Sequence, residues 1–290
     1  MNGVPAKVAM LADAARARTA NRFHAEINAL ADTIGAPWRQ LMVANLSYDL
    51  TLVQMGYSTI VLPTPNGPVV ARNMDWWPED LLARASCLFL HKRGDRLDFA
   101  HAGWPGSVGI VTGLSGRGFA VILNAVLCEE GFRKTGYPVL LHIRRVIQDA
   151  ANFDEALDML QNQKIIAPAL LTLVGSENHQ RVVVERTPTR HALRWAEADR
   201  PLITTNDYRL LQQPNRSHEV EIYQTTCHRF EFLTRTLSER NPTHTAADDE
   251  LLYRLTDENV QQSITAQHVL IRPRQREMKL FTPRHLTDGH

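Results

Sequence analysis

The N-terminal part of the chain is patterned as helix. Within residues 19–34, apolar residues recur at spacings of three and four, which place them on one face of a helix. These residues are Phe23, Ile27, Leu30 and Ile34. Gly35 follows as a stop signal and Pro37 as the opening of a new helix, so we predict a second helix over residues 38–53.

After these helices the pattern changes to short β-rich runs. The first two runs, residues 58–62 and 68–71, flank the turn sequence Pro65-Asn66-Gly67. Asn-Gly tolerates the positive φ that a tight hairpin needs. We therefore predict an antiparallel hairpin, with both strands central to one of two stacked sheets.

The rest of the chain alternates blocks of strands with blocks of helices. Strands are predicted at residues 87–92, 97–102, 109–113, 118–123, 170–174, 181–185, 191–195, 202–204, 268–272 and 278–281. Helices are predicted at residues 138–150, from a cap at Asn152 or Asp154 through Leu160, at 227–238 and at 248–255. Because hairpins replace alternating βα units, the pattern favours an α+β fold in which helices cover two antiparallel sheet layers. Nothing marks a linker, so we expect one domain over residues 1–290.

Charge and composition narrow the function classes. The chain has 32 Lys and Arg against 31 Asp and Glu, so net charge favours neither nucleic acid nor an anionic membrane as a partner. No run approaches the ~20 apolar residues of a membrane-spanning helix, and no signal peptide is recognisable. We expect a cytoplasmic protein without an integral membrane segment.

The cysteines and glycines indicate neither a metal nor a cofactor. Cys87, Cys128 and Cys227 are odd in number and lack the close spacing of a zinc site or a disulfide framework, which favours a reducing compartment. Residues 113–118, GLSGRG, lack the spacing of a dinucleotide-binding loop. We therefore expect no metal and no cofactor.

Arg72 and Asp75 are the first candidates for chemistry. They lie three residues apart, where the second hairpin strand is predicted to end. Taken alone, such a pair is more typical of a turn-stabilising ion pair than of a catalytic site. Asn206-Asp207, taken alone, is typical of a loop cap. The sequence around Arg72 and Asp75 favours a catalytic role for these residues, for the following reason.

Residues 56–77, which read GYSTIVLPTPNGPVVARNMDWW, resemble the N-terminal-nucleophile linear amide hydrolases. This family includes the acid ceramidase, N-acylethanolamine acid amidase, choloylglycine hydrolase, penicillin V acylase and isopenicillin N acyltransferase branches. The resemblance implies an αββα sandwich of two stacked antiparallel sheets. It also implies that residues 1–56 correspond to the family's α-subunit and residues 57–290 to its hydrolase core.

The resemblance also implies roles for individual residues. In the family, the residue after this glycine is the catalytic cysteine, whose own α-amino group is the base. Arg72 matches the arginine beside the thiolate, and Asp75 matches the aspartate that accepts a hydrogen bond from the α-amine. Asn206 matches the asparagine that donates to the oxyanion, and Arg229 resembles the distal arginine of the site. We expect these four side chains to converge around the backbone of Tyr57.

Three further residues are candidates for substrate binding. Asn124 lies where acyltransferase relatives also carry asparagine. Trp76 and Trp77 can line an acyl pocket, although two tryptophans after a strand are also typical of simple core.

The departure from the family lies at the nucleophile. Tyr57 stands at the cysteine position, and a phenol with a reference pKa of ~10 lacks the thiol needed for the acyl shift. The neighbouring Ser58 is a candidate replacement, but adjacent strand residues face opposite sides of a sheet. We therefore expect an uncut chain, in which a buried Asp75 finds its donor in the Tyr57 hydroxyl or in Arg72.

Two functions remain open at this stage. The first is an amide hydrolase that acts on or binds fatty-acyl amides, as the resemblance implies. The second is a lapsed enzyme that keeps the pocket and binds an acyl amide or a protein partner without turnover. In both cases the expected ligand is a small-molecule acyl amide, and no oligomeric state is predicted.

Overall fold

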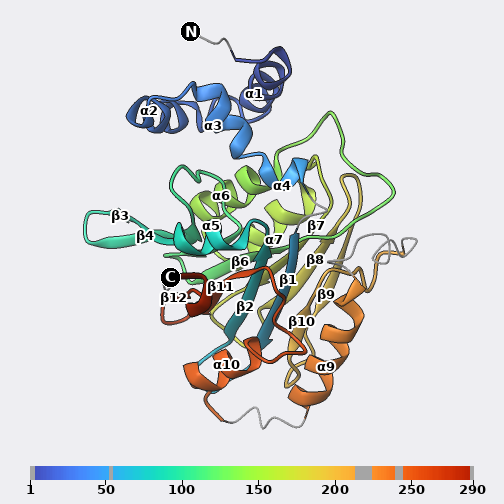
Figure 1. Cartoon of the computed structure of the whole chain (residues 1–290). Coiled ribbons are helices and arrows are strands. Elements are labelled where there is room, and N and C mark those ends of the chain that lie inside the picture. Colours follow the sequence, from blue (N-terminus) through green and yellow to red (C-terminus); the bar gives the residue numbers. More distant parts are fainter. Residues whose placement is uncertain (1–3, 52–54, 213–223, 239–243, 288–290) are drawn as a thin grey trace.

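The computed structural model describes residues 4–51, 55–212, 224–238 and 244–287. Its strands form two antiparallel sheets (Figure 1). The five-stranded sheet contains, in spatial order, β10 (Leu202–Thr204), β1 (Met55–Leu62), β2 (Val69–Trp76), β11 (Thr265–Arg272) and β12 (Glu277–Phe281). The seven-stranded sheet contains β3 (Cys87–Arg93), β4 (Arg96–Gly103), β5 (Thr112–Ser115), β6 (Phe119–Asn124), β7 (Ala169–Val174), β8 (Arg181–Arg186) and β9 (His191–Trp195).

Helices form the outer layers and an N-terminal group. They are α1 (Ala6–Arg18), α2 (His24–Ile34), α3 (Trp38–Ala44), α4 (Ser47–Leu50), α5 (Glu79–Arg84), α6 (Val139–Asp149), α7 (Phe153–Asn162), α9 (Thr226–Ser238), α10 (Asp248–Leu255) and α11 (Arg284–Thr287). Helices α6 and α7 pack on the seven-stranded sheet, whereas α9 and α10 pack on the five-stranded sheet. Helices α1 to α3 lie together at one end of the sandwich (Figure 1).

The two sheets are joined by a shared apolar layer. Val61 and Val269 of the five-stranded sheet lie in one buried cluster with Leu114 and Ile122 of the seven-stranded sheet. A second cluster lies between α9, α10 and the outer face of the five-stranded sheet. The order helix, sheet, sheet, helix confirms the predicted α+β sandwich.

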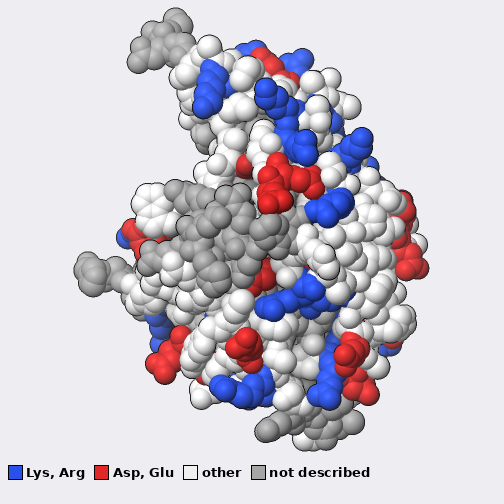
Figure 2. Space-filling model, turned by 90° about the vertical axis from the view of Figure 1, so that its right-hand side faces the viewer, with Lys and Arg blue, Asp and Glu red and all other residues white. Residues whose placement is uncertain are grey.

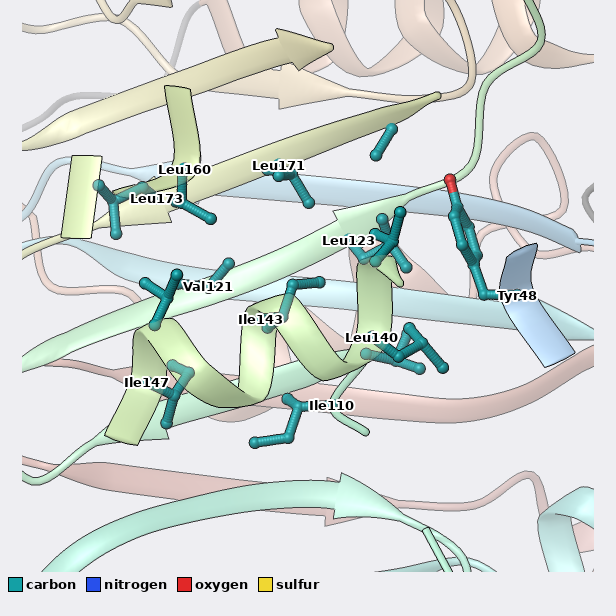
Figure 3. Close-up of a cluster of buried hydrophobic side chains, with 14 of the residues drawn as sticks. Tyr48, Ile110, Val121, Leu123, Leu140, Ile143, Ile147, Leu160, Leu171 and Leu173 are labelled. Carbon is teal, nitrogen blue, oxygen red and sulfur yellow. The ribbon is translucent and has the colours of Figure 1, made fainter. Parts of the chain in front are cut away.

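Helix α6 covers the outer face of the seven-stranded sheet with an apolar stripe. Ile143 and Ile147, four residues apart on α6, lie against Val121 and Leu123 of β6 (Figure 3). Every one of these side chains is fully buried, and burial of an aliphatic side chain contributes ~1.5–3 kcal/mol. This packing explains why the sequence pattern predicts α6 well.

The hairpin of β1 and β2 is central in its sheet, as predicted. Gly67 closes its turn with a φ of 91°, which a glycine adopts without steric cost. Both strands are longer than predicted, because pairing with β11 continues along β2 as far as Asp75. Arg72 and Asp75 therefore lie inside β2 and not at its exit, which corrects the predicted position.

The predicted helix over residues 38–53 is interrupted in the structure. Helix α3 ends at Ala44 and α4 begins at Ser47, while the predicted end at residue 53 lies outside the described residues. Between the two helices, the buried side chain of Asn45 accepts hydrogen bonds from the backbone of Val108 (2.7 Å) and Gly109 (2.9 Å). This tertiary contact overrides the helical pattern of the sequence.

Other boundaries also differ from the prediction. The strand expected at residues 109–113 begins only at Thr112, because Ile110 donates its backbone hydrogen bond to Leu140 of α6 (3.1 Å). Asn152, rather than Asp154, caps α7 by accepting from the Glu155 amide (3.0 Å). Helices α1, α5 and α11 were not predicted, since their short apolar stripes carry little periodic signal.

The surface carries charges of both signs. Figure 2 shows Lys and Arg side chains interspersed with Asp and Glu over one face of the molecule. In the described ranges, no helix has both the length and the apolar character that crossing a bilayer requires.

Candidate active site

Strand alternation separates the site into two faces of the five-stranded sheet. Tyr57 pairs with Met74, and Thr59 pairs with Arg72, so these side chains share the face that looks toward the seven-stranded sheet. Ser58 lies between them in the strand and faces the α9 side. The two candidate nucleophile positions are therefore on opposite faces.

Tyr57 is fully buried beneath the guanidinium of Arg72. The Arg72 Cζ atom lies 4.6 Å from the centre of the tyrosine ring, in the geometry of a cation–π contact. Burial raises the pKa of the Tyr57 phenol above its usual value, against a lowering effect of Arg72. The phenol is therefore held in its neutral form, and its hydroxyl has no hydrogen-bond partner among the described residues.

Arg72 is held by the opposite sheet. Its Nη1 donates to the Val111 carbonyl (3.0 Å) and to the Thr112 hydroxyl, and its Nη2 donates to the Leu123 carbonyl (2.7 Å). Burial lowers the Arg72 pKa to about 10, so the side chain stays charged at neutral pH. Within the described ranges, Arg72 and Asp75 make no direct ion pair, which removes the turn-stabilising interpretation of the pair.

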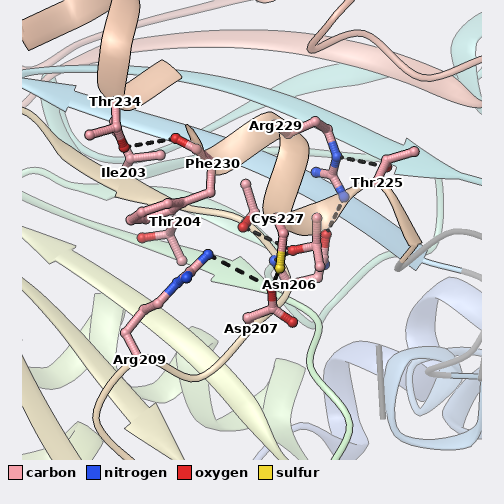
Figure 4. Close-up of polar contacts among 12 residues, drawn as sticks. Ile203, Thr204, Asn206, Asp207, Arg209, Thr225, Cys227, Arg229, Phe230 and Thr234 are labelled. Atoms are coloured by element: carbon pink, nitrogen blue, oxygen red, sulfur yellow. Dashed lines mark hydrogen bonds and ion pairs between the residues drawn. The ribbon is translucent and has the colours of Figure 1, made fainter. Parts of the chain in front are cut away.

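Arg229 and Asn206 hold the backbone of residue 57 from the helix side. Arg229 Nη1 donates to the Tyr57 carbonyl (2.8 Å) and to the Ser58 Oγ (2.9 Å), and Nη2 donates to the Asn206 Oδ1 (2.9 Å). The same Asn206 oxygen accepts from the Tyr57 amide (3.2 Å). Figure 4 shows Arg229 reaching from α9 toward Asn206. Asn206 and Arg229 thus contact Tyr57 although they lie 149 and 172 positions away from it in the sequence.

Asp75 receives its hydrogen bond from a residue that we did not predict. The Thr265 hydroxyl of β11 donates to Asp75 Oδ1 at 2.7 Å. The prediction that the Tyr57 hydroxyl or Arg72 would be the donor is wrong, because both groups lie on the other face of β2. Burial raises the pKa of Asp75, while Arg229, Thr265 and Arg72 lower it.

The donor groups of Asn206 are engaged within the protein. Its side-chain amide donates to the Ala125 carbonyl (2.8 Å), and its backbone amide donates to the Thr226 hydroxyl (2.8 Å). Asn124 nearby accepts from Thr59 (2.8 Å) and ties β6 to β1. Thr226, at the start of α9, was missed because a threonine at a helix start is common in any protein.

Ser58 is fixed rather than exposed. Its hydroxyl is fully buried and accepts the hydrogen bond from Arg229. A serine that attacks a carbonyl needs a base that removes its proton, whereas Arg229 is a donor. The structure therefore provides no base at the Ser58 hydroxyl among the residues that it describes.

A cavity of about 310 Å³ lies beside this region, and we call it the tryptophan pocket. Its aromatic wall comprises Trp76, Trp77 and Trp104. Trp76 meets Trp104 edge to face, with ring centres 5.2 Å apart, while Trp77 is 58% exposed at the rim. Val111, whose carbonyl binds Arg72, is also part of the lining. Val111 therefore connects the pocket to Arg72, which in turn contacts the Tyr57 ring.

The opposite wall of the tryptophan pocket comes from the N-terminal segment. Leu41, Ala44, Asn45 and Ser47, from α3 and the start of α4, line it. The other walls include Pro105, Gly106 and Leu140. The N-terminal segment and the hydrolase core, which the resemblance treats as separate parts of the chain, therefore build one cavity.

Direct contacts link five of the six proposed site residues, namely Tyr57, Ser58, Arg72, Asn206 and Arg229. Asp75 lies opposite Gly56 in the sheet, and its hydrogen bond comes from Thr265 and not from another proposed site residue. The described residues contain no group of three or more His, Cys, Asp or Glu side chains that can hold a metal ion.

Two stacked antiparallel sheets between helical layers, with a central strand that carries the residue 57 position, define an N-terminal-nucleophile hydrolase fold. A model of the family described as acyl-coenzyme A:6-aminopenicillanic acid acyl-transferase matches residues 62–281, which is most of the chain. The chain belongs to this family of amide hydrolases and acyltransferases. The match begins after Tyr57, so it does not cover the nucleophile position.

Individual relatives agree with this assignment. The chain is 23% identical over 189 residues to the N-acylethanolamine-hydrolyzing acid amidase of Caenorhabditis elegans, covering 60% of this chain and 52% of that protein. It is 24% identical over 188 residues to the acid ceramidase of Balaenoptera acutorostrata scammoni, covering 57% of this chain and 47% of that protein. The chain therefore spans about half the length of the curated relatives that it matches.

A solved structure supports the fold. The Caenorhabditis elegans N-acylethanolamine-hydrolyzing acid amidase ortholog superimposes with a TM-score of 0.61 and 16% sequence identity, covering 75% of this chain and 93% of that chain. At this identity the likeness is one of fold.

Proposed function

We propose that this chain binds a small acyl amide in an amide hydrolase fold that has lost its hydrolytic nucleophile. The observation that carries the proposal is the burial of Tyr57 in its neutral form, at the position that the resemblance aligns with the family's nucleophile. A neutral phenol is a weak nucleophile, and the contact with Arg72 leaves it without a base. The positioning groups Arg229 and Asn206 hold its backbone instead of activating its side chain.

Hydrolysis through Ser58 is the alternative function, and the geometry argues against it. The Ser58 hydroxyl accepts a hydrogen bond from Arg229 and faces α9. The tryptophan pocket lies on the other face of the sheet, where Trp76 and Val111 line it and the Val111 carbonyl binds Arg72. An amide bound in this pocket would therefore present its carbonyl to the Tyr57 side and not to Ser58.

The tryptophan pocket is the proposed place of the acyl group. Its aromatic wall and its aliphatic residues suit an apolar chain, and burial of such a chain contributes ~0.8 kcal/mol per CH₂. Ser47 and Ser107 supply hydroxyl groups for an amide head, whereas the Asn45 side chain is engaged by the backbone of the pocket wall. The relatives named for N-acylethanolamine and ceramide hydrolysis support the ligand class.

We further propose that the chain stays uncut, with residues 1–56 joined to residues 57–290 as one domain. All three cysteines are free thiols in the structure, which supports a reducing compartment such as the cytoplasm.

The experiment combines turnover and binding with one set of acyl amides. A fluorogenic amide series of increasing acyl length should give no product above the rate of buffer alone. If the wild type turns over a substrate and Ser58→Ala abolishes that turnover, the proposal of binding without hydrolysis is wrong and Ser58 is the nucleophile.

Binding is measured by quenching of tryptophan fluorescence with N-lauroylethanolamine. Trp77→Ala removes an aromatic side chain that is exposed at the rim and that a bound acyl group would cover. We expect binding to weaken about tenfold, because a buried aromatic contact contributes ~1–1.5 kcal/mol. Trp195→Ala is the matched control, since Trp195 is 47% exposed and lies outside this pocket. Equal affinities of the two variants would contradict the assignment of the pocket.

A further inference from the structure

Asp49 is a buried carboxyl group at the junction between the N-terminal segment and the hydrolase core. Its side chain is 3% exposed. Oδ1 accepts from the Val139 amide at 3.1 Å, and Oδ2 has no hydrogen-bond partner among the described residues. None of the proposed site residues uses Asp49, so its burial requires a separate explanation.

The hydrogen bond of Asp49 joins two elements. Asp49 belongs to α4, and Val139 is the first residue of α6, where the helix leaves its first amides without intrahelical partners. The neighbouring Tyr48 donates to the Pro168 carbonyl at 2.6 Å. Helix α4 is therefore docked on the core by polar contacts from consecutive residues.

The docked segment is also a wall of the tryptophan pocket. Ser47, two residues before Asp49, lines the pocket together with Asn45. Asn45 in turn accepts from Val108 and Gly109, which belong to the facing loop. When α4 leaves α6, this wall loses an anchor.

We propose that Asp49 is a proton-operated anchor, which holds the N-terminal wall of the tryptophan pocket more firmly when its carboxyl group is protonated. The inference rests on the proposed function of the pocket and adds its regulation by pH. A protonated carboxyl keeps the Oδ1 acceptor for Val139, while it removes a buried charge whose second oxygen lacks a donor. Acidification thus tightens the wall without breaking its hydrogen bond.

The surrounding charges allow this titration. Burial raises the pKa of Asp49 to about 7, and Arg18 of α1 is the charged side chain that lowers it. On α6, His142 is held against the Met159 carbonyl of α7 at 3.1 Å, and burial lowers its pKa to about 3. Arg144 is engaged by Glu26, and Arg145 donates to Gln163. Asp49 is therefore the group at this junction that titrates near neutral pH.

The sign follows from linkage. The undocked carboxyl has an ordinary pKa of ~3.9, and the docked one has a raised pKa, so docking takes up a proton between these values. Docking becomes more favourable as the pH falls through 7 and is weakest above it. Between pH 8 and pH 5 the change in the docking equilibrium is roughly 80-fold.

The experiment is hydrogen exchange on the full-length protein at pH 5 and pH 8, corrected for the intrinsic exchange rate. The Val139 amide reports the anchor, since Asp49 is its partner, and the Val146 amide within α6 reports unfolding of the helix. We expect the protection of Val139 relative to Val146 to rise at least tenfold from pH 8 to pH 5. Equal relative protection at the two pH values would overturn the anchor.

Variants separate the anchor from other acidic effects. Asp49→Asn keeps the acceptor and should make the protection of Val139 relative to Val146 independent of pH, whereas Asp32→Asn, at an exposed position of α2, should leave the wild-type response unchanged. Should Asp49→Asn not fold, the wild-type pH response alone decides the proposal.

The affinity for N-lauroylethanolamine, measured in parallel, should also increase toward pH 5 in the wild type only. Absence of binding at both pH values would contradict the proposed function, while the exchange of Val139 still decides the anchor.

Discussion

At position 57 the backbone is held by neighbouring residues, so whether this residue can act as a nucleophile depends on its side chain. Asn206 accepts from the amide of Tyr57 and Arg229 donates to its carbonyl, so both lie at the backbone position expected from the resemblance, while the role of Asn206 as an oxyanion donor stays a prediction. Thr265 could not be predicted, because a threonine that opens a β-strand carries no signal and its partner is 190 residues away. Contacts between distant strands depend on register, which a single sequence does not reveal.

A thiol at position 57 should restore self-processing. Tyr57→Cys supplies the missing nucleophile where the backbone is already held, at a cost of ~3 kcal/mol for the lost aromatic ring. We expect cleavage before residue 57, seen as two fragments by mass spectrometry. Tyr57→Ala opens a similar cavity without a thiol and should stay whole. A folded Tyr57→Cys protein that remains uncut would show that further groups needed for cleavage are missing.

Arg229 should be the least replaceable charged residue of the site. Arg229→Lys leaves one ammonium group to serve acceptors on Tyr57, Ser58 and Asn206, which a planar fork reaches together. We expect a loss of about 2–4 kcal/mol in the free energy of unfolding, since buried acceptors remain unpaired. Urea denaturation measures the loss. Arg235→Lys, at an exposed position of the same helix, should change the free energy by less than ~0.5 kcal/mol, and a similar effect of both substitutions would refute the argument.

At the scale of elements, the sequence predicts those helices and strands that have a strong periodic pattern, but not the boundaries that depend on tertiary contacts. The amphipathic α6 and the hairpin of β1 and β2 follow from residue spacing and from the Asn66-Gly67 turn. The interruption between α3 and α4 depends on Asn45 and the loop that it binds, so no local pattern signals it. The same applies to β5, whose start is displaced by the contact of Ile110 with Leu140.

The hairpin turn should tolerate substitution less well than a helix end of similar backbone conformation. Gly67 (φ 91°) and Gly35 (φ 67°) both lie in the left-handed region. A Cβ at Gly67 would lie 2.7 Å from the Ser176 carbonyl oxygen, whereas nothing lies within 4 Å of one at Gly35. We expect Gly35→Ala to cost ~1 kcal/mol and Gly67→Ala ~3 kcal/mol in urea denaturation. Equal costs would mean that β1 and β2 shift to relieve the contact.

At the scale of the whole molecule, buried histidines should make the protein acid-sensitive. Burial lowers the pKa of His101 and His142 to about 3 and that of His268 to about 4. The unfolded chain binds these protons near pH ~6.5, so stability is lost as the pH falls below that value. Asp49, whose pKa is raised to about 7, acts in the opposite direction.

The three histidines outweigh the buried carboxyl groups. Each histidine removes about 2 kcal/mol between pH 7 and pH 5, and Asp49 returns about 2 kcal/mol. Burial also raises the pKa of Asp75, which reduces the loss further, so we expect a net loss of about 2–4 kcal/mol. Urea denaturation at the two pH values measures this loss. His268→Asn should reduce the pH dependence by about half. A protein that is equally stable at pH 5 and pH 7 would show that these histidines are protonated in the folded state.

The central claim is that the fold of an amide hydrolase persists here without its self-processing nucleophile. Intact-mass spectrometry of the purified full-length protein tests it most directly, because family maturation would split the chain before residue 57. The account predicts a single species at the full 32.8 kDa. Two fragments, one of them beginning at Tyr57 or Ser58, would contradict it and identify a nucleophile that works in this setting.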